Sequence, residues 1–125
     1  MSAHSTTLAL SVRQPWAWLI VNRWKPVENR TWPTKVRGWV AIHASQKIDR
    51  AGYEWVRSEF PHIEMPPVAA LECGGLVGQS LLEDCVSDYY SRWFRGPYGF
   101  VFADAMSLPF VPCRGQLGFF RPVLG

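Results

Sequence analysis

The sequence predicts an α+β fold, in which about six short strands form a small barrel or strongly curved sheet flanked by two or three helices. The chain has 125 residues, which is close to the usual size of one domain and too few for two. Hydrophobic residues make up 48% and charged residues 18%, a balance typical of a globular protein with a core. The expected strands are short and the helices lie irregularly between them, which disfavours a doubly wound parallel sheet. We therefore expect one domain over residues 1–125, with residues 1–6 as a flexible N-terminal tail.

The first part of the chain predicts a strand, a helix and a second strand. Residues 6–12 are rich in Leu, Ala and Val, which favours a strand. Pro15 suits the first turn of a helix, and apolar residues at helical spacing predict that helix over residues 16–23. Pro26 ends the helix, because the residue before a proline is pushed out of the α region. Residues 27–32 then predict a strand.

The middle of the chain predicts a core strand followed by a helix. In the strand expected over residues 38–45, Val40, Ile42 and Ala44 alternate with their neighbours and should face the core. Residues 48–60 carry apolar side chains along one side at helical spacing and predict a helix.

The C-terminal half predicts three further strands and one short helix. Residues 74–86 read as a strand bent at its glycines, and Ser87 is a candidate N-cap for a helix over residues 88–94. The closing strands are expected over residues 100–106 and 115–123, separated by a loop that contains Pro109 and Pro112.

Charge permits a nucleic-acid partner without requiring one. The net charge is +3 and the isoelectric point is about 9.0, so the protein is mildly basic. Five basic residues fall within fifteen positions and are opposed there only by Glu28: Arg23, Lys25, Arg30, Lys35 and Arg37. From charge alone, a solvated positive face explains this cluster.

Cysteine usage and hydropathy argue against several classes of protein. The three cysteines, Cys73, Cys85 and Cys113, show no CxxC spacing, so we expect neither a disulfide framework nor a metal site, and no cofactor. Residues 1–7 lack the apolar segment of a signal peptide. The longest apolar run, residues 16–21, is far shorter than a membrane span. We expect a cytoplasmic protein with no membrane partner.

The most informative segment is residues 23–30, Arg-Trp-Lys-Pro-Val-Glu-Asn-Arg. Glu28 and Arg30 lie two apart on the expected strand, on the same face as Trp32, and Lys25 stands at the preceding corner. Arg30 could grip a phosphate with two hydrogen bonds, and a partly buried Lys25 could act as a base. Glu28 could hold Arg30 or transfer a proton. From the spacing alone, a surface salt-bridge cluster is the favoured interpretation.

Several segments together resemble the ASCH (activating signal cointegrator-1 homology) domain, whose signature is G-x-K-x-x-E-x-R. The matching segments occur in the family's order from about Leu8 to Phe120: Ser11-Val-Arg-Gln-Pro-Trp16, Lys25-x-x-Glu28-x-Arg30, Thr31-Trp32, Arg37-Gly38, Ile42-His-Ala44, Gly75-Leu-Val-Gly78 and Gly115-Gln-Leu-Gly118. The sequence departs from the signature at Arg23, which stands where the family has glycine. A glycine there would permit a positive φ or a close approach to ligand.

The resemblance implies a PUA-like β-barrel with a cleft lined by the motif residues, and RNA as the class of ligand, with DNA bound by some members. One small bacterial branch of the family hydrolyses N4-acetylcytidine, and another bacterial member is described as a ribonuclease. Lys25 matches the catalytic lysine of the amidohydrolase branch, but Glu28 stands where that branch has threonine. No counterpart of its catalytic glutamate is identifiable in this chain.

Five further residues are candidates for ligand binding. Trp32 could stack a base, since it shares a face with Glu28 and Arg30. Arg37 could meet phosphate, and the amide of Gln14 could read a base edge. His43 and Ser45 point the same way from the expected strand over residues 38–45; His43 could act as a base or ligand contact, although a structural histidine is the commoner case.

Three functions remain open at this point. The first is an RNA-binding module whose cleft takes a nucleotide or modified base. The second is a metal-independent hydrolase of RNA or of a modified nucleoside, in which Lys25 and Glu28 share acid–base work. The third is a protein-interaction module. Binding ranks ahead of catalysis, because an enzyme that cleaves RNA must also bind it.

Overall fold

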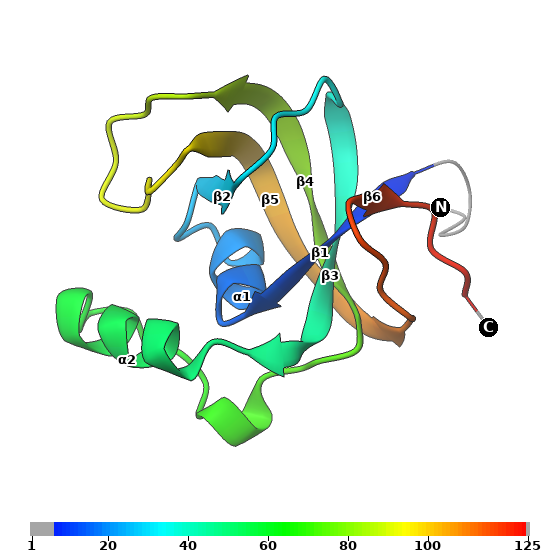
Figure 1. Ribbon diagram of the computed structural model, residues 1–125. Coiled ribbons are helices and arrows are strands. Elements are labelled where there is room, and N and C mark those ends of the chain that lie inside the picture. Colours follow the sequence, from blue (N-terminus) through cyan, green and yellow to red (C-terminus); the bar gives the residue numbers. More distant parts are fainter. Residues whose placement is uncertain (1–6, 125) are drawn as a thin grey trace.

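The computed structural model describes residues 7–124, which form a single curled sheet with two α-helices (Figure 1). The expected N-terminal tail lies outside the described residues. The elements in chain order are β1 (Leu8–Gln14), α1 (Trp16–Val21), β2 (Val27–Arg30), β3 (Gly38–Ile48), α2 (Arg50–Glu59), the 3-10 helix η1 (Val68–Ala70), β4 (Gly75–Val86), β5 (Tyr98–Pro112) and β6 (Phe119–Phe120).

The sheet has six strands in the order β2-β5-β4-β3-β1-β6. Only β1 and β3 pair in parallel; the other neighbours are antiparallel. The sheet curls into a half-barrel, and α1 lies in its concavity (Figure 1). The predicted α+β fold, a strongly curved sheet with flanking helices, is therefore confirmed.

The core lies between the concave face of the sheet and α1. Val40, Ile42 and Ala44 of β3 are completely buried, as their alternation predicts. They pack with Leu10 and Val12 of β1 in one cluster, which also contains apolar residues of α1, β4 and β5: Ala17, Ile20, Val21, Val77, Leu82, Phe100 and Phe102. This packing fixes the position of β1, which also forms one wall of the cavity described in the next subsection.

Helix α2 covers a second apolar cluster outside the barrel. Its Val56 packs with Leu19 of α1 and Val27 of β2. The helix begins at Arg50, two residues later than the sequence predicts, because the Asp49 carboxylate caps it by accepting a hydrogen bond from the backbone N–H of Gly52 at 2.8 Å. Ile48 instead ends β3.

The helix predicted over residues 88–94 is wrong: this segment is irregular, with one bend at Ser91 and a turn at residues 92–93. The backbone N–H and C=O of Trp93 form hydrogen bonds with side chains instead of with other backbone groups of a helix. The N–H of Trp93 donates to the hydroxyl of Ser91 at 3.1 Å, and the carbonyl of Trp93 accepts from the Asn29 amide at 3.0 Å. Such side-chain bonds compete with a helical backbone.

The C-terminal strands also differ from the prediction. β5 continues through the expected loop to Pro112, and Pro109 falls where the β4–β5 register shifts, a place where a missing N–H is tolerated. The strand expected over residues 115–123 is reduced to Phe119–Phe120. Within residues 7–124, no helix is long and apolar enough to cross a membrane.

We predict that Gly52→Ala destabilises the protein even though alanine is the better helix former. A Cβ at this position would overlap the Trp16 ring and lie 2.7 Å from Asp49 Oδ2. The gain in helix propensity is about 1 kcal/mol, whereas overpacking costs roughly 1–3 kcal/mol. Chemical denaturation should show a net loss of stability, while the exposed Ser58→Ala in the same helix should not. A Gly52→Ala variant more stable than wild type would contradict this packing.

Candidate functional site

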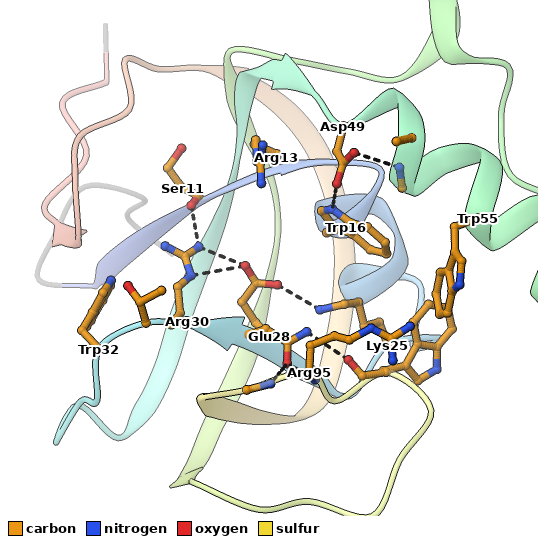
Figure 2. A pocket seen from close by; sticks show the side chains of 16 residues that line it. Ser11, Arg13, Trp16, Lys25, Glu28, Arg30, Trp32, Asp49, Trp55 and Arg95 are labelled. Carbon is orange, nitrogen blue, oxygen red and sulfur yellow. Dashed lines mark hydrogen bonds and ion pairs between the residues drawn. The ribbon is translucent and has the colours of Figure 1, made fainter.

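A cavity of about 730 Å³ opens between β1, β2, the start of α2 and the turn after Trp93 (Figure 2). Its volume is in the range of small-molecule and nucleotide sites. The lining combines charged, aromatic and small polar residues: Ser11, Arg13, Trp16, Lys25, Glu28, Asn29, Arg30, Thr31, Trp32, Asp49, Ala51, Gly52, Trp55, Trp93, Arg95 and Gly96.

Glu28 stands at the centre of a buried ion network in this cavity. Its Oε1 lies 2.9 Å from Nζ of Lys25, and its Oε2 lies 3.1 Å from Nη2 of Arg30. Lys25 also donates to the carbonyl of Val27, and Arg30 Nη2 donates to the carbonyl of Ser11 at 2.8 Å. Lys25 is 3% exposed and Glu28 is 8% exposed. The network therefore ties β1, β2 and the corner before β2 together.

The electrostatics of the network keep Glu28 ionised. Burial alone would raise the pKa of the carboxyl, but the charges of Lys25 and Arg30 and their hydrogen bonds outweigh it, so the pKa lies below its ordinary value of 4.5. At neutral pH, Glu28 is a carboxylate whose two oxygens both accept hydrogen bonds.

A tight reversal of the chain after α1 brings Lys25 into the cavity. The N–H groups of Trp24 and Lys25 both donate to the carbonyl of Leu19, and Arg23 adopts a φ of 67°. This left-handed conformation explains why glycine suits the position of Arg23. The Arg23 side chain does not line the cavity; its Nε donates to the carbonyl of Ala105 at 2.6 Å.

Four tryptophans and two free cations complete the lining. Trp16 is half-buried and packs against both apolar clusters, as a core residue would, but it also lines the cavity. Trp32 lies edge-on to Phe100 and 5.9 Å from the Arg30 guanidinium. Arg13 and Arg95 are exposed, and neither forms an ion pair within residues 7–124.

Four of the predicted site residues come together in this cavity: Lys25, Glu28, Arg30 and Trp32. Two others line neither cavity described here. Arg37 is exposed, donates to the carbonyls of Thr34 and Val36, and lies 3.7 Å from Asp84. Gln14 is buried; its Nε2 donates to the carbonyl of Glu72 and its Oε1 accepts from the N–H of Trp18, so its amide supports the fold.

His43 and Ser45 line a second cavity, of about 760 Å³, beside the loop over residues 113–117. His43 is buried with both ring nitrogens engaged: Nε2 lies 2.7 Å from the carbonyl of Cys113, and Nδ1 lies 2.9 Å from the hydroxyl of Ser11. Because a carbonyl only accepts, Nε2 carries the hydrogen. His43 therefore has the contacts of a structural histidine, and Ser11 separates the two cavities.

Sequence reasoning missed Arg13, Asn29, Trp55 and Arg95 as lining residues. Arg13 and Asn29 lie inside segments that resemble the family motif. Their position beside other motif residues on β1 and β2 was the signal that could have predicted them as lining residues. Trp55 and Arg95 reach the cavity through contacts across long stretches of chain, and no local pattern marks them.

A family model for the ASCH domain matches residues 10–101. The chain belongs to the ASCH domain family. The matched region contains the whole Lys25–Glu28–Arg30 network and Trp32, so the cavity coincides with the ASCH motif. The curved six-stranded sheet with two helices agrees with the PUA-like barrel expected of an ASCH domain. No curated protein matches the chain significantly.

We predict that Glu28→Gln destabilises this ASCH domain by about 3 kcal/mol at neutral pH, because it leaves the buried Lys25 without a counter-charge. The native pKa of Glu28 is lowered, so its stabilising effect is complete above the ordinary value of 4.5 and is lost as the pH falls through the native pKa. Denaturation of wild type and variant should therefore differ at pH 7 and converge below pH 4.5.

The exposed Glu54→Gln, whose partner Arg57 lies 3.2 Å away, is the matched control and should change stability by less than about 0.5 kcal/mol. An unfolding free-energy difference between wild type and Glu28→Gln that persists undiminished into acid would contradict the lowered pKa.

We predict that Arg23→Gly is more stable than Arg23→Ala by about 1 kcal/mol, because only alanine strains the positive φ. Both variants lose the bond to Ala105, so their comparison isolates the backbone effect. Equal urea midpoints for the two variants would show that this conformation is not maintained in solution.

Proposed function

We propose that this ASCH domain binds single-stranded RNA and takes one nucleotide or modified base into the cavity. The observation that supports this proposal is the coincidence in one cavity of an ionised Glu28, the aromatic lining, and Arg13 and Arg95, which form no ion pair within residues 7–124. Aromatic stacking combined with cationic phosphate contacts is the usual way to hold single-stranded RNA.

Each of these lining side chains has a role that follows from the hydrogen-bond donors, acceptors or ring surface that it leaves available to a ligand. Trp32 offers a stacking surface at the edge of the cavity, worth about 1–3 kcal/mol per base. Nε of Arg30 donates to Glu28, and Nη2 donates to the carbonyl of Ser11. Within the described residues Nη1 makes no hydrogen bond, so Nη1 can donate to the ligand. Glu28 retains lone pairs that can accept from an amino group of a base. Arg13 supplies a phosphate contact.

Binding explains the network better than catalysis does. Nζ of Lys25 donates to Glu28 Oε1 and to the carbonyl of Val27, an arrangement of a donor and not of a proton acceptor. The lowered pKa of Glu28 makes it a poor general acid. Hydrolysis of RNA or of N4-acetylcytidine is the second candidate, favoured by the placement of Lys25 beside Glu28 at the cavity wall.

We predict that Arg13→Gln weakens binding of single-stranded RNA, measured by fluorescence anisotropy across a salt series. Loss of one phosphate contact should lower the affinity and reduce the slope of log affinity against log salt by about 0.7. Lys35→Gln is the matched control, because Lys35 is an exposed cation of the same basic segment that lines neither cavity. Equal losses in the two variants would place binding outside the cavity.

The same titration with DNA of identical sequence tests the choice of nucleic acid. Mass spectrometry of RNA carrying N4-acetylcytidine after incubation tests the hydrolase alternative: loss of the acetyl group or strand scission would make the domain an enzyme. An unchanged mass with salt-dependent binding supports the binding module, and absence of both would contradict the proposed function.

A further inference from the structure

We propose that Arg95, held over Trp55, forms a phosphate-binding subsite at one end of the cavity, so that the domain takes a nucleotide in preference to a free nucleoside. This inference rests on the proposed function and specifies its ligand. Figure 2 shows Trp32 and Trp55 at opposite ends of the cavity, with Glu28 and Lys25 between them. A ligand that spans the cavity can therefore contact chemically different groups at its two ends.

The position of Arg95 leaves its hydrogen-bonding edge open. The guanidinium lies over the Trp55 ring, 4.8 Å from its centroid, and forms no ion pair within residues 7–124. An arginine over an indole gains from the cation–π interaction and loses side-chain freedom, while its N–H donors stay available. Those donors match the geometry of a phosphate, which they can bind with two parallel hydrogen bonds.

The backbone at Arg95 is held by the neighbouring strand. The side-chain Oδ1 of Asn29 accepts from the N–H of Arg95 at 2.7 Å and from the N–H of Gly96 at 3.1 Å, while its Nδ2 donates to the carbonyl of Trp93 at 3.0 Å. Asn29 lies between Glu28 and Arg30 on β2. One short strand therefore positions both the ion network and the turn that carries Arg95, which fixes the spacing between the two ends of the cavity.

The same segment contains a natural control. Arg92 also lies over an aromatic ring, 4.2 Å from the centroid of Phe60, but it pairs with Glu59 at 3.3 Å and does not line the cavity. Both arginines are exposed. Replacing either by glutamine removes one positive charge and one cation–π contact. Arg92→Gln also removes the exposed ion pair with Glu59, and only Arg95→Gln changes the cavity lining.

The experiment is calorimetric titration of wild type, Arg95→Gln and Arg92→Gln with the 5′- and 3′-monophosphates of the four common ribonucleosides and with the nucleosides themselves. Thermal unfolding checks that both variants are folded. We expect wild type to bind its preferred monophosphate at least about tenfold more tightly than the nucleoside, the value of one charge-assisted contact. Arg95→Gln should abolish this preference, and Arg92→Gln should retain it.

Equal affinity of wild type for monophosphate and nucleoside, or equal effects of the two substitutions, would overturn the phosphate subsite and leave RNA binding standing. If mononucleotides bind too weakly to titrate, a single-stranded pentaribonucleotide decides the question: Arg95→Gln must then weaken binding and reduce its salt dependence more than Arg92→Gln does. Failure of every RNA ligand to bind wild type would instead contradict the proposed function.

Discussion

The buried ion network around Glu28 is the constraint on which the rest of the site depends. It joins the corner after α1 through Lys25, strand β2 through Arg30, and strand β1 through the carbonyl of Ser11. Within residues 7–124, no buried side-chain nitrogen or oxygen lacks a hydrogen-bond partner, so the desolvated polar atoms of the network are all hydrogen-bonded. A buried ion network contributes less stability than apolar packing of the same volume would. Its position in a cavity wall therefore agrees with the ligand-binding role proposed above.

Local pattern was sufficient to predict the centre of this site. The period of β2 places Glu28 and Arg30 on one face, Pro26 places Lys25 at a corner, and Trp32 lies two residues beyond the end of the strand; all four line the cavity. The same alternation identified the buried face of β3. The buried face of β3 is confirmed, and Lys25, Glu28 and Arg30 lie together, because both groupings depend on residues a few positions apart, where backbone geometry fixes which side chains meet. The curved α+β fold followed from the same local signals and from the size of the chain.

The outer parts of the site could not be read from the sequence because distant contacts create them. Residues 88–94 have the composition of a short helix, but Asn29 on β2 takes the backbone bonds of the following turn and thereby directs Arg95 to the cavity. His43 is separated from the ion network by the parallel pairing of β1 with β3, which puts Ser11 opposite it and leaves its ring bonded within the fold. The amide of Gln14 is likewise bonded within the fold, because it accepts from the N–H of Trp18 in α1 and donates to the carbonyl of Glu72. No local sequence pattern predicts which distant strands pair, or which polar side chains use all their hydrogen-bonding atoms within the fold.

Charge is divided between the wall of the cavity, formed by the Lys25–Glu28–Arg30 network, and its rim, where Arg13 and Arg95 lie, and this division affects recognition. Glu28 neutralises one of the two positive charges of Lys25 and Arg30. Lys25 and Glu28 are buried and Arg30 is partly buried, so bulk salt screens their interactions weakly. Arg13 and Arg95 are exposed and unpaired within the described residues, so attraction of a polyanion falls chiefly to them and is screened by salt. In the proposed function, Arg13 and Arg95 would therefore govern affinity and its salt dependence, whereas the fixed donors and acceptors of the network would govern which base fits. Under that proposal, such a separation would let one domain bind the RNA backbone generally while selecting a particular nucleotide inside the cavity.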